Sequence, residues 1–128
     1  MRVLLVHAHP NPDSLNRAIA DTARAALERG GHEVRFLDLH AIGFDPVMSR
    51  EERAAYHTPA KNEVPVAEHL EALRWCQALV FVYPTWWFGL PAILKGWLDR
   101  VLVPHATFAL PTEERPMQPL LSNITTIT

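Results

Sequence analysis

The apolar residues of this chain form either continuous runs or helical repeats. Continuous runs at Val3–Val6 and Leu79–Tyr83 are typical of strands that are buried on both faces. A third group, Val34, Phe36 and Leu37, predicts a strand between them. The pattern therefore predicts three strands, with the first and the last in the interior of a sheet.

Helical spacing separates these strands. Apolar residues recur every three or four positions in segments 15–27, 66–75 and 93–102, which predicts three helices. Asp13 or Ser14 is a suitable N-cap for the first helix, because either side chain accepts hydrogen bonds from free N–H groups of the first turn. A strand, a helix and a strand in succession form a βαβ unit, which requires parallel strands and a right-handed crossover.

The other segments have weaker patterns. Residues 40–62 are too long for an ordinary connection and predict a binding or dimer-contact element with one helical turn, in which the charged run Arg50–Arg53 forms a solvated face. Residues 104–119 are rich in proline and predict an irregular connection, and residues 120–128 predict a fourth strand. The expected fold is one α/β domain over residues 1–128, with a doubly wound parallel sheet of order 2-1-3-4(-5). Its fifth strand and last helix are missing from the pattern, so we expect a further segment or a partner chain at the fourth strand.

The loop after the third strand is the most informative stretch. Residues 84–89 carry Trp86, Trp87 and Phe88, and Pro91 is suited to the first position of the helix that follows. Three adjacent aromatic side chains diverge from one another, so at least one should lie at the surface or line a cleft. An aromatic wall with free backbone N–H groups suits a flat, conjugated ligand such as a flavin ring. The alternative is that these aromatics cap the sheet as part of the core.

The loop after the first strand has the features of an anion site. It is polar and leads into the start of a helix, where unpaired N–H groups and the helix dipole favour negative charge. Ser14, Asn16 and His9 can add side-chain donors. The loop lacks the glycines of the common nucleotide-binding fingerprints, and a capped helix without a ligand is the alternative. In a 2-1-3-4-5 sheet both informative loops emerge at the same switch point, so we expect them to be neighbours.

Composition narrows the possible classes of protein. A formal net charge of −2 and an isoelectric point near 6.4 give no electrostatic reason to expect nucleic acid or an anionic membrane as a partner. No apolar run is long enough to span a membrane or to act as a signal peptide. Cys76 is the only cysteine, which excludes an internal disulfide and is typical of a cytoplasmic protein. We expect Cys76 to be a structural thiol.

Two motifs resemble those of one known family. Ala8-His9 followed by Ser14-Leu15-Asn16 is similar to the phosphate loop of the flavodoxin-like NAD(P)H:quinone oxidoreductases, and the stretch from Tyr83 to Val101 is similar to the long signature of that family. The resemblance covers essentially the whole chain. In the family the chain continues past the fourth strand into a Thr-Gly-Gly loop, whereas Thr125-Thr126 here is not followed by glycine.

The resemblance implies a bound flavin, with FAD favoured over FMN, that receives hydride from NAD(P)H and delivers it to a quinone-like acceptor in a homodimer. It assigns no catalytic side chain and no metal. The residues that would contact the flavin are His9, Ser14, Leu15, Asn16, Pro84, Thr85, Trp86, Trp87 and Phe88. The residues that would contact the acceptor are Trp87, Phe88 and Phe108.

Two other classes fit parts of the sequence. His7, His9 and Asp13 follow the first strand as in zinc-dependent deacetylase-type hydrolases, but Asn11 and Pro12 stand where such a site has its paired acids. A non-catalytic flavodoxin-like binding or regulatory subunit, or an electron carrier, would keep the same scaffold without turnover. The remaining histidines are scattered and are expected at the surface: His32, His40, His57, His69 and His105.

Overall fold

The structure, a computed structural model, describes residues 1–128. Its main feature is a four-stranded parallel sheet in the order β2-β1-β3-β6. The strands are β1 (Arg2–His7), β2 (Glu33–Asp38), β3 (Ala78–Val82) and β6 (Thr126–Ile127). This order confirms the predicted 2-1-3-4 arrangement, with β6 as the fourth strand of the sheet.

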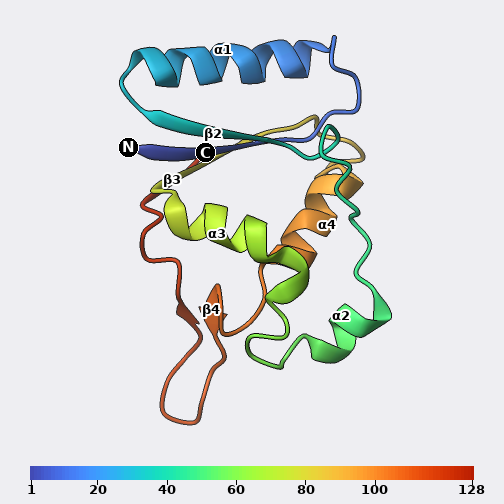
Figure 1. Cartoon of the computed structure of the whole chain (residues 1–128), viewed down its shortest axis with the longest axis vertical. Helices are drawn as coiled ribbons and strands as arrows, with labels where there is room; N and C mark the ends of the chain where they lie inside the picture. The colour runs from blue at the N-terminus through green and yellow to red at the C-terminus, as the bar shows by residue number, and fades with distance from the viewer.

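Helices cover the two faces of the sheet unequally. Helix α1 (Leu15–Arg29) lies on one face, and α3 (Ala67–Trp75) and α4 (Ala92–Val101) lie on the other (Figure 1). All three predicted helices are thus confirmed. A 3₁₀ turn, η1 (Val64–Val66), leads into α3, and the excursion between β2 and α3 contains only the short helix α2 (Arg50–Ala55). No helix is long and apolar enough to cross a bilayer.

The main core lies between the sheet and helices α3 and α4. Among its members, each at most 1% exposed, are Leu4, Val6, Leu70, Leu73 and Trp97. Burial of a large apolar side chain contributes roughly 2 kcal/mol, so this layer supplies much of the stability of the fold. It also fixes the position of α4, the helix that begins directly after the aromatic loop.

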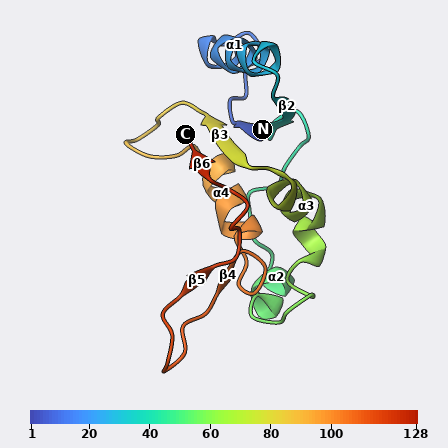
Figure 2. The same cartoon turned by 90° about the vertical axis from the view of Figure 1, so that its left-hand side faces the viewer.

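The sequence predicts burial on both faces of β3, and this is wrong for part of the strand. Val80 and Val82 are only half-buried. They lie beside Leu5 and His7 of β1 on the face that carries α1. Helix α1 is the one helix on this face, and it contacts β3 without covering it completely (Figure 2). Pro91 also differs slightly from its predicted place, because it is the N-cap of α4 and not its first residue.

The predicted strand over residues 120–128 is wrong for most of its length. Only Thr126–Ile127 forms a strand, which pairs with β3. The side-chain amide of Asn123 donates to the carbonyl oxygens of Leu73 and Cys76, at 2.9 and 2.6 Å, and so ties this segment to the end of α3. The backbone therefore turns before it can extend beside β3.

The proline-rich segment is more regular than predicted. Two short antiparallel strands, β4 (Phe108–Ala109) and β5 (Gln118–Pro119), pair with each other and form a small hairpin below the main sheet (Figure 1). The residues between these strands have no regular structure, in agreement with the predicted irregular connection.

The excursion is held against α4 by an ion pair. The expectation of one helical turn in this segment agrees with α2, but that of a solvated charged face is wrong for Glu52. Its carboxylate pairs with Arg100 of α4 at 2.7 Å, and the two side chains are 15% and 13% exposed. Burial raises the pKa of Glu52, but hydrogen bonds from the Ser49 backbone and from Arg100 outweigh it, so the pKa lies below its ordinary value. Arg100 also packs over the ring of Phe44, 5.1 Å from its centroid.

Candidate functional site

The loops that follow β1 and β3 meet at the carboxyl end of the sheet. The Ala8 N–H donates to the carbonyl oxygen of Val82 at 3.1 Å. One residue further, the His9 and Trp86 rings meet edge to face, with centroids 5.8 Å apart. Strands β1 and β3 flank the switch point of the sheet, which is where open α/β sheets bind ligands. The predicted proximity of the two loops is confirmed.

The loop before α1 presents unpaired donors. Ser14 is the N-cap of α1, and its Oγ accepts the Arg17 N–H at 3.1 Å, so its own O–H remains able to donate. His9 accepts the Asn11 N–H through Nδ1 at 3.0 Å, which leaves Nε2 for another partner. The buried Oδ1 of Asn16 has no hydrogen-bond partner. The Ser14 O–H and His9 Nε2, together with the helix N-terminus, form a cradle of donors that suits a phosphate, whereas the Asn16 Oδ1 is an acceptor and does not bind one.

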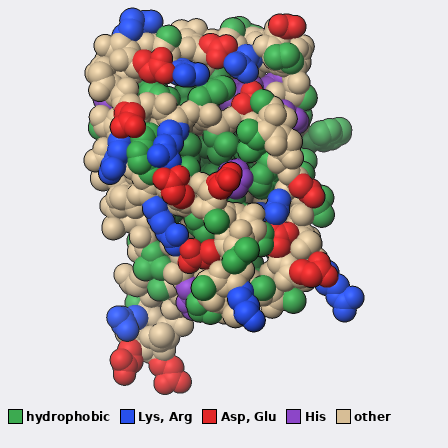
Figure 3. All heavy atoms as spheres, in the orientation of Figure 1, with side chains coloured by type: hydrophobic (Ala, Val, Ile, Leu, Met, Phe, Trp, Pro, Cys, Tyr) green, Lys and Arg blue, Asp and Glu red, His purple; other side chains and the backbone are tan.

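The aromatic loop is a tight turn closed by two hydrogen bonds between Trp86 and Gly89, at 3.1 and 3.2 Å. Trp87 and Phe88 occupy its corners with φ of 48° and 60°, a left-handed conformation that costs bulky residues about 1–3 kcal/mol each. They are 96% and 99% exposed, and Trp86 is 46% exposed. The alternative in which these aromatics cap the sheet as core is therefore wrong. Apolar side chains, in green, stand out from the right-hand edge of the molecule in Figure 3, which is the edge where the loop between β3 and α4 lies in Figure 1.

The structure does not bring all the predicted residues together. Leu15 is exposed at the start of α1, and Pro84 and Thr85 lead from β3 into the aromatic turn, so these three lie in or beside the two loops. Phe108 lies apart from them, half-buried in β4. The ten residues of α4, about 15 Å of helix, separate the aromatic loop from the segment that carries Phe108. Within one chain, Phe108 is therefore not part of this site.

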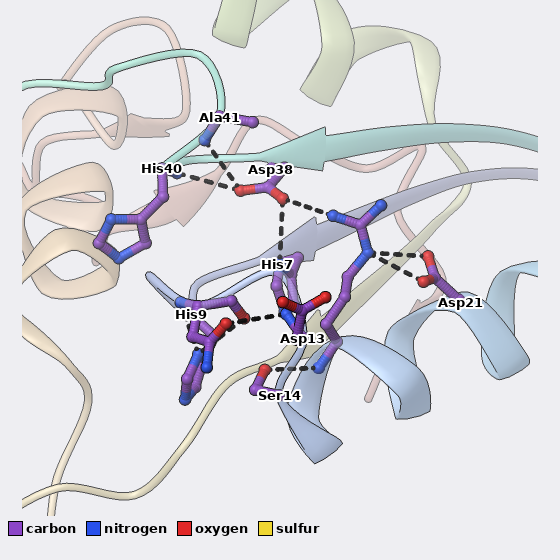
Figure 4. A network of polar contacts seen from close by, with 10 residues as sticks. His7, His9, Asp13, Ser14, Asp21, Asp38, His40 and Ala41 are labelled. Carbon is purple, nitrogen blue, oxygen red and sulfur yellow. Dashed lines mark hydrogen bonds and ion pairs between the residues drawn. The ribbon is translucent and has the colours of Figure 1, made fainter.

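Sequence reasoning missed a polar network behind the first loop. Asp38 ends β2 beside His7, and its Oδ2 lies 3.0 Å from Nη1 of Arg17 and 3.4 Å from Nδ1 of His7 (Figure 4). Its Oδ1 accepts the backbone N–H groups of His40 and Ala41, each at 3.1 Å. The one available signal was an acidic residue at the carboxyl end of a predicted strand next to the first loop. A cavity of about 220 Å³ lies between this network and the loop.

His7 is neutral in this network at pH 7. The side chain is fully buried, and neither ring nitrogen has a hydrogen-bond partner of good geometry. Burial lowers the pKa of His7, by more than the neighbouring Asp38 carboxylate raises it. The charge of Asp38 is therefore balanced by Arg17 and not by His7.

The histidines do not converge on a metal site. His7 faces Asp38, whereas His9 faces Trp86. No group of three histidine, cysteine, aspartate or glutamate side chains has the arrangement of metal ligands. His69 is also not the surface residue that the sequence predicts, because it is half-buried and accepts the Trp97 Nε1–H at 3.2 Å.

A larger cavity, of about 540 Å³, lies between β2, α3 and residues 42–45. It contains none of the residues predicted to bind flavin, and Arg100 in its wall is already paired with Glu52. The available hydrogen-bond donors and the exposed aromatic side chains lie in the loops after β1 and β3. We therefore take these two loops, and not the larger cavity, as the candidate site.

The fold and the paired loops define a parallel α/β protein whose candidate site lies at the switch point of its sheet. Residues 1–125 match the family model described as flavodoxin-like fold. The chain belongs to this family.

Individual relatives agree with this assignment. An NAD(P)H oxidoreductase of Haemophilus influenzae is 40% identical over 124 residues, which cover 96% of this chain and 60% of that protein. NAD(P)H dehydrogenase [quinone] 1 of the rat is 34% identical, over 91% of this chain and 49% of that protein. The crystal structure of Smu.1420 from Streptococcus mutans has a TM-score of 0.82 and 34% identity, and the match covers 99% of this chain and 66% of that one.

More distant structures share the fold. An FMN-dependent NADH-azoreductase of Bacillus anthracis, solved in complex with FMN, has a TM-score of 0.71 at 17% identity, which is a likeness in fold alone. The chain spans about half of the length of the curated relatives that it matches.

Proposed function

We propose that this chain is the flavin-binding part of an NAD(P)H:quinone oxidoreductase. The observation that carries the proposal is the contact between the His9 ring, at the head of the phosphate-type cradle, and Trp86, at the base of the exposed aromatic turn. A flavin nucleotide needs both features within one molecule's length, because it joins a phosphate to a flat conjugated ring. The names of the relatives support NAD(P)H as the hydride donor and a quinone as the acceptor.

The residues present fit a flavin nucleotide. The N-terminus of α1, with the O–H of Ser14 and Nε2 of His9, offers donors to the phosphate. The exposed faces of Trp87 and Phe88 offer a surface against which a flat ring can stack. When bound, a flavin supplies the hydride-transfer chemistry.

The protein's own part in the reaction is binding and orientation. The turn around Trp87 and Phe88 is fixed by its two backbone hydrogen bonds, so its aromatic faces are in place before a ligand arrives. A ring stacked on them would exclude water from one of its faces. The first loop is tied to the sheet through Ala8, so the two halves of the site keep a constant separation. No side chain in either loop is placed as a nucleophile, and we assign none.

We extend the proposal to the details that the sequence suggests. FAD is favoured over FMN, the acceptor is quinone-like, and the protein works as a homodimer in the cytoplasm. The single buried thiol and the absence of any disulfide fit a reducing compartment. Light scattering on the purified chain tests the dimer, because two copies give about twice the mass of 14.5 kDa.

The first experiment is a visible absorption spectrum of the purified chain titrated with FAD and, separately, with FMN. We expect a perturbed flavin band at about 450 nm that bleaches when NAD(P)H is added and returns when a quinone is added, as hydride transfer through flavin requires. Binding without bleaching would support the alternative of a non-catalytic subunit. A chain that binds neither flavin would contradict the proposal.

A substitution in the aromatic turn tests the site itself. Trp87→Ala should weaken flavin binding by about tenfold, within the range of stacking on an aromatic side chain, and should leave the free energy of unfolding nearly unchanged because Trp87 is 96% exposed. Val64→Ala is the matched control, since Val64 is 74% exposed and lies outside both loops. Equal flavin affinity in the wild type and Trp87→Ala would rule out this turn as the flavin platform.

A further inference from the structure

We propose that Asp38 is a positioning residue for the phosphate cradle, which it holds in place through Arg17. The proposal rests on the proposed function, since the cradle is the phosphate-binding half of the flavin site. Asp38 belongs to β2, on the side of β1 away from the aromatic loop, and its polar partners are Arg17, His7 and the backbone of residues 40 and 41, not Ser14 or His9. Its effect on a ligand would therefore be transmitted through the first turn of α1.

Arg17 connects Asp38 to the cradle by two hydrogen bonds of different kinds. Its backbone N–H donates to the Oγ of Ser14, the N-cap, at 3.1 Å. Its guanidinium donates to Oδ2 of Asp38 at 3.0 Å. One residue therefore joins the start of α1 to the end of β2, and its guanidinium packs over the ring of Phe36, 5.1 Å from the centroid. Figure 4 shows Ser14 and Asp38 on opposite sides of this link.

Asp38 is bound more firmly than the other carboxylate on Arg17. Its side chain is 12% exposed and accepts from Arg17 and from the backbone N–H groups of His40 and Ala41. Asp21 accepts from Nε of the same Arg17 at 2.9 and 3.0 Å, but it is 53% exposed and lies one turn along the same helix. An exposed pair within one helix contributes little, and it cannot tie the helix to the sheet. Asp21 is thus a natural control for Asp38.

The direction in which Asp38→Asn changes phosphate affinity distinguishes a positioning role from a purely electrostatic one. Replacing Asp38 by Asn removes a negative charge close to the cradle and leaves Arg17 paired with Asp21 alone. If charge alone mattered, a phosphate would then bind more tightly. If Asp38 positions the cradle, Arg17 without its ion pair to β2 no longer holds the first turn of α1 against the sheet, and a phosphate binds more weakly.

The test compares two flavins that differ in the phosphate, FMN and riboflavin, on the full chain. We expect Asp38→Asn to weaken FMN binding by about tenfold, which corresponds to about 1.4 kcal/mol, and to change riboflavin binding by less than about twofold. Asp21→Asn should leave the affinity for both flavins within about twofold of the wild type. Tighter FMN binding by Asp38→Asn, unchanged FMN binding, or an equal loss for both flavins would overturn the proposal.

Two further measurements keep the outcome clear. Arg17→Gln removes the other end of the link and should show the same selective loss of FMN if Asp38→Asn does not fold. Amide hydrogen exchange in the flavin-free chain reports the link without any ligand, and the Arg17 N–H should exchange faster in Asp38→Asn than in Asp21→Asn. If the wild type binds no flavin, the proposed function fails, and this exchange rate alone decides the role of Asp38: equal rates in the two variants would overturn it.

Discussion

Gly96 of α4 is the position where the smallest change should have the largest effect on the fold. The residue is buried in the middle of the helix, where the backbone of Pro46 from the excursion packs directly against it. A Cβ atom at this position would meet the carbonyl oxygen, Cβ and Cα of Pro46, with the last at 2.5 Å. Real Cβ atoms essentially never approach other atoms below 3.0 Å, so Gly96→Ala requires the excursion to move.

Two opposing contributions decide the size of the effect. Inside a helix, alanine is favoured over glycine by about 1 kcal/mol, so helix propensity alone predicts a more stable variant. Overpacking costs about 1–3 kcal/mol, and the high end applies here because the atoms of Pro46 include rigid backbone. Displacement of the excursion would also weaken the Arg100–Glu52 pair. We therefore expect Gly96→Ala to lower the free energy of unfolding by about 2 kcal/mol, a large share of the 5–15 kcal/mol typical of a domain.

Urea unfolding followed by tryptophan fluorescence measures this effect, because Trp97 is fully buried next to Gly96. Gly89→Ala is the control, since the nearest atom to its added Cβ, the carbonyl oxygen of Trp87, is 4.0 Å away. A Gly96→Ala variant that is as stable as the wild type, or more stable, would refute the packing of the excursion on α4.

Three further predictions concern buried ionisable groups. Burial lowers the pKa values of His7 and His69, so below the ordinary value of 6.5 these side chains bind protons more readily in the unfolded chain than in the folded one. The free energy of unfolding should therefore fall as the pH drops from 7 to 5. A free energy from urea unfolding that does not change over this range would contradict the prediction. Glu52→Gln should lower the free energy of unfolding by about 1–2 kcal/mol, because it leaves its partner Arg100, which is only 13% exposed, without a counter-charge. Asp99→Asn is the control: Asp99 is in an exposed pair with Lys95, and its loss should cost less than about 0.5 kcal/mol in the same measurement. Cys76 should react slowly with a disulfide reagent until urea is added, because burial raises its thiol pKa; fast reaction of the native chain would contradict its buried position.

The order of the strands could be predicted because it depends on local patterns and on general rules of connection. The apolar run Val3–Val6 marks an interior strand without reference to any other part of the chain, and a strand, helix and strand in succession leave only a right-handed parallel crossover. The caps are equally local, since Ser14 needs only the N–H of Arg17, three residues on.

What the sequence could not predict depends on pairs that are far apart in the chain. The turn at Asn123 is set by carbonyl groups of Leu73 and Cys76, about fifty residues away, and these override the strand propensity of the residues around it. The Asp38 network likewise exists only because the register of β1 and β2 places His7 opposite Asp38. Periodicity reports which face of an element is apolar, but it contains no information about such pairs.

The aromatic turn is where local preference and final structure disagree most, and this disagreement supports its functional assignment. Tryptophan and phenylalanine normally contribute to stability by burial, yet Trp87 and Phe88 are 96% and 99% exposed, and both hold a left-handed backbone that disfavours bulky side chains. Neither feature stabilises the isolated chain. Strain and exposure at the same two residues, beside a helix N-terminus with free donors, are expected where a ligand supplies the missing contacts. If so, flavin binding should protect the turn from exchange and quench the fluorescence of Trp87, and a ligand that leaves both unchanged would place the flavin elsewhere.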